Sequence, residues 1–248
     1  MTTTKRKITA EDLYYFELIS APQISPDGEQ VVYAQQRVEP QTEKKYSHIW
    51  IAATDGSGTQ QFTFGNQVDN LPKWSPDGTQ IAFVSNRGDE KQAQIYLIPS
   101  KGGEARALTD LNGEFKTFEW SPDGTQLVLQ FRKKDADVIE REDDEQKRKL
   151  GIVERHYERV FYKFDGYGFL PQERWHIWVV DINSGQARQL SDDPVFDEEE
   201  PTWSPDGQWI VARSNRNPDP DLTRSDNDLV LIPANGGELR VIKTPGRE

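Results

Sequence analysis

Three histidines are the first candidates for acid–base chemistry, because imidazole is the side chain that ordinarily titrates near neutral pH. His48 and His176 both stand in the tripeptide HIW, and Gln94 and Asp228 take the same place in two further copies of the repeat described below. A polar position that recurs with a repeat indicates a structural slot rather than a catalytic residue. His156 lies outside the repeat, so it is a candidate for facing a neighbouring domain, although an ordinary exposed histidine is the more frequent case.

Carboxylates form the second group of candidates. The stretch SDDPVFDEEEPTW contains Glu198, Glu199 and Glu200, which are candidates for contacting a substrate. The alternative is a solvated acidic loop, which is the commoner role of such runs. Four aspartates recur in the turns of the repeat, but each belongs to its own turn, and separate turns lie too far apart to share an ion. We therefore predict no metal, no cofactor and no catalytic residue in this chain; the recurring aspartates are Asp27, Asp77, Asp123 and Asp206.

The elements that would position these residues are set by a repeated turn. The sequence WSPDG occurs at Trp74–Gly78, Trp120–Gly124 and Trp203–Gly207, and ISPDG at Ile24–Gly28. Successive serines of these turns are separated by 50, 46 and 83 residues. Removing an insertion of about 37 residues brings the last interval into step, and a period of about 40–50 residues indicates a repeat architecture. Proline pre-sets the first central residue of a turn and glycine accepts positive φ, so each copy predicts a hairpin.

Each repeat reads as four antiparallel strands, which predicts an all-β fold of propeller blades. We expect a helical segment over 1–20 and a partial β-propeller over 21–248. The tryptophans of the turn motif, Trp74, Trp120 and Trp203, are expected in the core between blades. The predicted blades cover about 21–64, 72–109, 118–191 and 201–242, with the insertion at 133–173 in the third.

The insertion is the least repetitive part of the chain. DADVIEREDDEQKRKLG is rich in helix formers and ends in glycine, which predicts a charged helix. Six aromatic residues follow between Tyr157 and Phe169. So much aromatic surface seldom stays in water, so we expect it to pack against the propeller or against another domain, and Tyr167 and Phe169 are the candidates for facing that domain.

Composition narrows the function classes. The chain has 248 residues and a formal net charge of -12, which disfavours nucleic acids and anionic membranes as partners. It contains no cysteine, so disulfides are excluded. The first ten residues are polar and basic and do not resemble a secretory signal, and no apolar run is long enough to span a bilayer. We therefore predict a cytoplasmic protein.

WSPDGTQIAFVSNR and IYLIPSKGGEARALT resemble TolB-like propeller repeats, which also form the N-terminal domain of serine peptidases of the prolyl oligopeptidase family. The segments 8–38 and 159–190 resemble the acylaminoacyl-peptidase branch of that family. The resemblance implies a ring of about seven blades, four of them present here, followed by an α/β-hydrolase domain. The G-x-S-x-G motif of that domain is not present, and DGSGT at Asp55–Thr59 has the wrong spacing.

The resemblance implies a non-catalytic propeller that gates substrate access and shapes specificity in a serine peptidase. Its partners would be the hydrolase domain, which we expect to be missing from this chain, and short peptide substrates. Open blade faces would favour self-association. The alternative function is a stand-alone TolB-like propeller that acts as a protein-binding scaffold.

Overall fold

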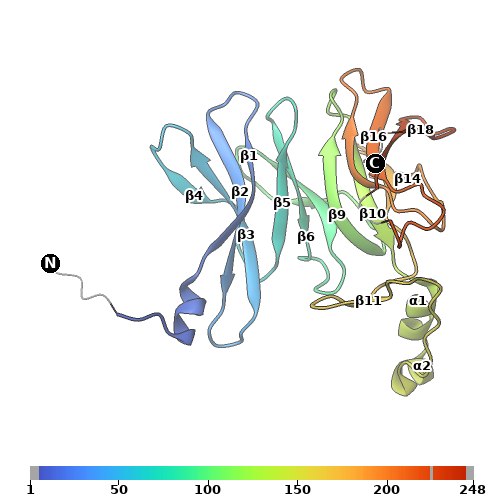
Figure 1. The fold of residues 1–248 in the computed structure, drawn as a ribbon. Coiled ribbons are helices and arrows are strands. Elements are labelled where there is room, and N and C mark those ends of the chain that lie inside the picture. The colour runs from blue at the N-terminus through green and yellow to red at the C-terminus, as the bar shows by residue number, and fades with distance from the viewer. Residues whose placement is uncertain (1–5, 224–225, 244–248) are drawn as a thin grey trace. The chain divides into compact units, whose positions relative to one another are not determined.

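The structure is a computed structural model that describes residues 6–223 and 226–243 (Figure 1). Its fold is all-β, and several four-stranded antiparallel sheets are present, as the repeat predicts. The ends of the predicted segments at 1–5 and 244–248 lie outside the described residues. No helix among the described residues has both the length and the apolar character needed to cross a membrane.

The chain divides into two compact units, residues 1–108 and 109–248. In the first unit a short 3-10 helix, η1 (Ala10–Tyr15), is capped by Thr9 and Asp12 and precedes two sheets whose strands pair in chain order. Sheet I comprises β1 (Leu18–Ile24), β2 (Gln30–Val38), β3 (Lys45–Ala53) and β4 (Thr59–Gln61). Sheet II comprises β5 (Asp69–Trp74), β6 (Gln80–Ser85), β7 (Gln94–Pro99) and β8 (Arg106–Ala107).

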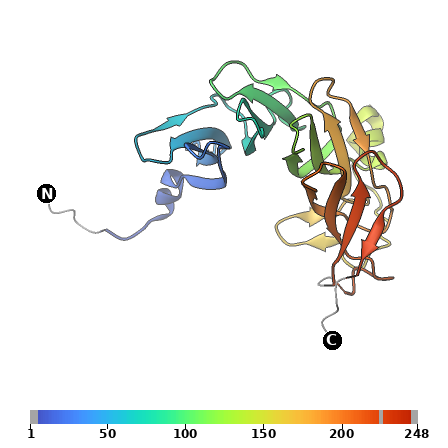
Figure 2. The same ribbon diagram turned by 90° about the horizontal axis from the view of Figure 1, so that it is seen from above.

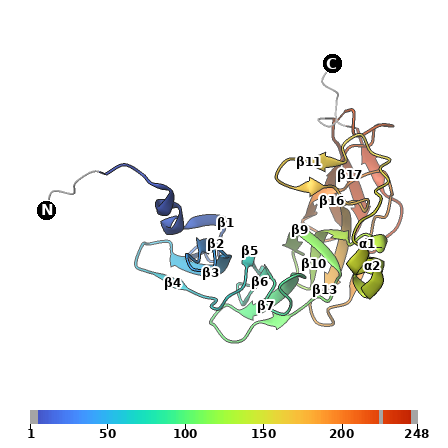
Figure 3. The same ribbon diagram turned by 90° about the horizontal axis from the view of Figure 1, so that it is seen from below.

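The second unit also contains two four-stranded sheets (Figure 2). Sheet III comprises β9 (Gly113–Trp120), β10 (Gln126–Lys133), β13 (His176–Asp181) and β14 (Ala187–Gln189). Sheet IV comprises β15 (Glu199–Trp203), β16 (Trp209–Ser214), β17 (Asp228–Pro233) and β18 (Arg240–Ile242). Between β10 and β13 the chain forms two helices and a small hairpin: α1 (Ala136–Asp143), α2 (Glu145–Leu150), β11 (Lys163–Phe164) and β12 (Gly168–Phe169) (Figure 3).

The repeated turn is closed by its own side chains. In the second copy, Asp77 Oδ1 accepts hydrogen bonds from Ser75 Oγ at 2.6 Å and from the Thr79 N–H at 3.0 Å. Ser75 Oγ in turn accepts from the Gln80 N–H at 3.0 Å, and Gly78 has a φ of 70°. The same three bonds recur in the other three copies. The turn aspartates are thus occupied by the hairpins that they close.

The core of each unit lies between its two sheets. In the first unit Val32 and Ile49 of sheet I pack in one cluster with Trp74 and Phe83 of sheet II. In the second unit the cluster joins apolar residues of sheets III and IV, and Trp203 packs against it. Trp74 and Trp203 therefore occupy the core positions predicted for them, whereas Trp120 is half-buried in β9.

Candidate functional site

A β-bulge places Glu200 in the first strand of sheet IV. The register passes from Glu199 opposite Arg213 to Thr202 opposite Val211, so that Glu200 and Pro201 together face one residue of β16. Glu200 has a φ of 55°, which is uncommon for a residue other than glycine. Such bulges bend a strand and redirect its side chains.

The same bulge recurs in sheets I and II. Ala21 precedes Pro22 with a φ of 50°, and Leu71 precedes Pro72 with a φ of 53°. The positive φ is therefore a property of the repeat, and only the fourth copy places a charged residue there. The signal was present in the sequence, because each of these prolines stands three residues before the serine of the turn, but the pattern predicted only a plain strand.

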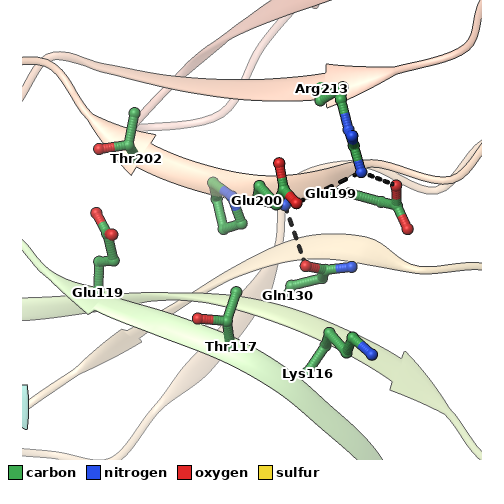
Figure 4. A pocket seen from close by; sticks show the side chains of 9 residues that line it. Lys116, Thr117, Glu119, Gln130, Glu199, Glu200, Thr202 and Arg213 are labelled. Atoms are coloured by element: carbon green, nitrogen blue, oxygen red, sulfur yellow. Dashed lines mark hydrogen bonds and ion pairs between the residues drawn. The ribbon is translucent and has the colours of Figure 1, made fainter. Parts of the chain in front are cut away.

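A second bulge meets the first one in the second unit. In β9, Lys116 is the extra residue between the pairs Phe115–Phe131 and Thr117–Gln130. The strands β9 and β15 contact each other, and the two bulges open a pocket of about 420 Å³ between them (Figure 4). Its lining residues are Lys116, Thr117, Glu119, Gln130, Glu199, Glu200, Pro201, Thr202 and Arg213.

Ion pairs order one side of this pocket. Arg213 lies 2.9 Å from Glu199 Oε2 and 3.4 Å from Glu200 Oε1, and the Glu200 N–H donates to Gln130 Oε1 at 3.0 Å (Figure 4). The Glu200 side chain is 68% exposed, and Arg213 Nε is buried without a hydrogen-bond partner. Two carboxylates thus share one arginine, so the pocket can bind a positively charged or hydrogen-bonding group.

Glu198 has a different environment from its two neighbours. Its side chain is fully buried, and His176 Nδ1 and Ser191 Oγ each lie 2.8 Å from its Oε2. The other oxygen, Oε1, accepts from Arg216. This carboxylate is occupied by His176, Ser191 and Arg216, so it is not available to a ligand.

The first unit contains the counterpart of this network. His48, Thr63 and Asp69 stand where the second unit has His176, Ser191 and Glu198. Thr63 Oγ1 accepts from the Ile49 N–H at 2.9 Å, just as Ser191 Oγ accepts from the Ile177 N–H at 3.0 Å. Arg87 binds Asp69 at 2.9 Å, as Arg216 binds Glu198. The histidines therefore belong to the repeat, as their spacing predicts.

His176, Ser191 and Glu198 carry the groups of a hydrolytic triad without its geometry. In a triad the serine hydroxyl bonds the histidine, and the carboxylate bonds the opposite ring nitrogen. Here Ser191 Oγ donates to the same carboxylate oxygen that binds His176, and all three side chains are buried. The arrangement joins two sheets and does not activate a nucleophile.

The candidate residues of the insertion lie in two environments. The Tyr167 hydroxyl donates to Glu114 Oε2 at 2.9 Å and contacts Arg132, which ties the β11–β12 hairpin to sheet III. Burial and the bond to Glu114 raise the pKa of Tyr167. Phe169 instead stacks on Tyr157 at 5.8 Å, and Arg155 lies 4.1 Å above its ring. The His156 side chain is exposed, and its nearest charged partner is Glu158 at 3.4 Å.

Comparisons with known proteins agree with this fold. The model of the TolB beta propeller domain (PD40) matches residues 1–157. The chain is 31% identical over 212 residues to YuxL, an uncharacterized peptidase of Bacillus subtilis, covering 85% of this chain and 32% of YuxL. It is 34% identical over 91 residues to dipeptidyl-peptidase 5 of Porphyromonas gingivalis, covering 37% of this chain and 13% of that protein.

The solved structures that resemble the chain include the acylaminoacyl peptidase of Pyrococcus horikoshii. It superposes with a TM-score of 0.70 at 21% identity, over 92% of this chain and 32% of the peptidase, which shows a shared fold. The chain thus spans about a third or less of the length of these proteins. Because the family model matches well over half of the residues and the four-stranded sheets have the strand pairing of blades, the chain belongs to the TolB β-propeller (PD40) family.

Proposed function

We propose that this chain is the non-catalytic propeller part of a serine peptidase of the acylaminoacyl-peptidase type, within the prolyl oligopeptidase family. The observation that carries the proposal is the 31% identity to the peptidase YuxL along 85% of the chain. In this function the propeller covers the active site of an α/β-hydrolase domain, admits short peptides and shapes specificity. The four sheets are blades of a larger ring, for which we propose seven blades.

The pocket between β9 and β15 is the part of the chain that we propose contacts the peptide. Glu199 and Glu200 supply carboxylates. The exposed Glu200 makes the longer of the two contacts with Arg213, so a cation of the peptide can compete with the arginine for it. Because two carboxylates share one arginine and Glu200 is largely exposed, we propose that this side of the pocket binds the positively charged end of a peptide. Glu198 has no part in this role, since its carboxylate is buried in the contact between sheets III and IV.

The insertion is the part that we propose faces the hydrolase domain. Tyr167 is half-exposed on a hairpin anchored to sheet III, and the side chains of Phe169 and His156 are also exposed. An anchored hairpin with exposed aromatic rings fits a domain contact, because aromatic residues are enriched at protein interfaces.

Serine reactivity tests the non-catalytic role. The 248-residue chain should hydrolyse no acyl-amino-acid p-nitroanilide and should not be labelled by a fluorophosphonate. The Ser191→Ala variant is the control, because Ser191 lies beside a histidine and a glutamate. Stoichiometric labelling of wild type that disappears in this variant would mean that the chain carries its own nucleophile.

Peptide binding separates the peptidase function from the scaffold function. We expect Ala-Ala-Ala-amide, which has a free amine, to shift NMR signals of residues lining the β9–β15 pocket. Glu200→Gln should weaken this binding, whereas Glu104→Gln, an exposed glutamate of the first unit, should not. If the peptide binds nowhere on the chain, a stand-alone scaffold that recognises folded proteins becomes the better assignment.

A further inference from the structure

A second cavity, of about 310 Å³, lies between the insertion and the loop that follows β14. Tyr162, Leu170 and Val195 supply apolar walls, and Tyr157 and Arg159 supply polar ones. This cavity shares no residue with the pocket between β9 and β15. Its size suits a group no larger than one or two amino-acid residues.

Two residues that line this cavity each carry a buried hydrogen-bond donor that has no partner among the described residues. The donors are the Tyr157 hydroxyl and Arg159 Nε. The ring of Tyr157 is held in place by stacking on Tyr162 at 4.9 Å and on Phe169 at 5.8 Å. Buried polar groups are nearly always hydrogen-bonded, because an unpaired one has lost its water without compensation. Two of them on one cavity indicate a ligand that brings acceptor atoms.

The charges around the cavity indicate an acceptor without net charge. Arg159 lies 3.5 Å from Asp221 and 3.9 Å from Asp197, and Arg174 lies 3.3 Å from the same Asp197 carboxylate. Two guanidinium groups are therefore paired with two carboxylates, and Glu158, which also lines the cavity, adds a third carboxylate. A ligand carboxylate would add an uncompensated negative charge, whereas a carbonyl oxygen would not.

We propose that this cavity binds a neutral main-chain segment of a peptide. Carbonyl oxygens of the peptide accept hydrogen bonds from the Tyr157 hydroxyl and from Arg159 Nε, and an apolar side chain packs against Leu170 and Val195. The inference deepens the proposed function, because it adds a peptide-contacting region on the insertion. Its test is binding to this chain alone, so its failure leaves the serine-reactivity test and the Glu200 test unaffected.

The experiment uses three probes that share one side chain: N-acetyl-leucine amide, which is neutral, N-acetyl-leucine, which is anionic, and leucine amide, which is cationic. Each is titrated into the 248-residue chain and followed by NMR. We expect the neutral probe to bind most tightly, with a Kd on the order of 1 mM, as suits so small a ligand. Its shifts should fall on Tyr157, Leu170 and Val195.

Two variants test the donors. Tyr157→Phe should lower the affinity for the neutral probe about fivefold, which is the typical effect of one hydrogen bond. The melting temperature should not fall, because the hydroxyl has no partner among the described residues of the free chain. Arg159→Lys keeps a positive charge for Asp197 and Asp221 but removes Nε, so it should also lower the affinity for the neutral probe. Tyr162→Phe, which removes a hydroxyl from the neighbouring ring of the same stack, is the matched control and should bind as wild type does.

Three outcomes would overturn the proposal. One is saturable binding of none of the probes. Another is binding of the anionic probe as tightly as the neutral one, which would contradict the charge balance. The last is unchanged affinity in both Tyr157→Phe and Arg159→Lys, which would mean that the two donors do not contact the ligand.

Discussion

His176 Nδ1 lies 2.8 Å from Glu198 Oε2, in a contact where both side chains are buried. Glu198 immediately precedes the first strand of sheet IV, and the histidine opens the third strand of sheet III. Arg216 closes the contact from the far side of Glu198. One carboxylate therefore links His176 of sheet III to Arg216, which follows the second strand of sheet IV.

Replacing Glu198 with alanine should strongly destabilise the second unit. Removing one partner of a buried ion pair costs about 3–5 kcal/mol, and here, among the described residues, it leaves Arg216 with only the more exposed Asp193, at 3.8 Å. The free energy of unfolding in urea measures the effect. Glu199→Ala is the control, because Glu199 pairs with Arg213 in a half-exposed position and should cost at most about 1 kcal/mol. Equal effects of the two substitutions would contradict the buried network.

Lengthening the acid of the first unit should create the missing contact there. Asp69 is one methylene shorter than Glu198, and both His48 Nδ1 and Asp69 Oδ1 are buried without a partner in the described part of the chain. In Asp69→Glu, the carboxylate should reach His48 and raise its pKa, as followed by NMR titration of the imidazole. Asp69→Asn keeps the short side chain, removes the charge and should lower the pKa. A His48 pKa that falls in Asp69→Glu would show that the longer acid points elsewhere.

Stability should decrease as the pH falls below 6.5, because of His48. Burial is the main cause that lowers the pKa of His48 from its usual 6.5, with Arg37 and Arg87 adding to it and Asp69 opposing it. The unfolded chain therefore binds a proton at a pH where the folded chain does not. The contribution of His48 to the free energy of unfolding is therefore full above pH 6.5, and it is lost as the pH falls toward the lower pKa of the folded state.

The measurement is the free energy of unfolding between pH 5 and 7.5 for wild type and His48→Gln. Glutamine occupies the equivalent place in sheet II, at Gln94, so the substitution suits the repeat. The variant should show a smaller slope with pH below 6.5. The turn aspartates do not interfere in this range, because hydrogen bonds from the turn serines hold their pKa values below the usual 3.8.

The turn glycines should resist substitution for conformational reasons alone. Gly78 and Gly207 have φ values of 70° and 68°, and an added Cβ at either would meet no atom closer than 3.7 Å. Alanine should therefore cost about 1 kcal/mol through backbone strain, without a clash. Gly58→Ala is the control, since that glycine also has open space and lacks a positive φ. Melting temperatures unchanged at Gly78 and Gly207 would contradict the turn geometry.

Exposed apolar residues on the outer strands should make the isolated chain associate. Leu18, Ile19 and Ile24 of β1 are each more than half exposed, and Ile242 of β18 is 45% exposed. Sedimentation equilibrium should show a mass that rises with concentration, and Ile19→Glu should reduce the rise. Leu150→Glu, at an exposed position on α2, should not. A monomer mass at all concentrations would contradict the prediction.

The turns could be predicted from the sequence because every group that closes them lies within six residues. Ser75, Asp77 and Gly78 define the hairpin before any other part of the chain is placed. The contact between His176 and Glu198 joins residues 22 apart in the chain, so it depends on how the sheets pack. Aligning the repeats would have found it, since a histidine, an acid and an arginine recur in both units.

The pocket was only partly predictable. The acidic run predicts Glu199 and Glu200 as candidates. It does not distinguish them from the buried Glu198, because the environment changes within one residue at the start of β15. Lys116 and Arg213 were not predicted, because the bulges that bring them together are not visible as strand alternation. In the insertion, the partners of Tyr157 and Arg159 could not be inferred, because that segment has no second copy to compare.

The bulges also determine what the sheet edges can do. β1, β5 and β15 are each the outermost hydrogen-bonded strand of their sheet, and Pro22, Pro72 and Pro201 remove a donor from those edges. β9 has Phe118 in place of the proline, but its own bulge places Lys116 two residues earlier on the same edge strand, and a charge also disfavours edge pairing. An incoming strand therefore finds no regular ladder to extend. We expect these edges to resist amyloid-like growth and domain exchange, and the peptide that we propose beside β15 to be recognised through side chains instead of being incorporated into the sheet.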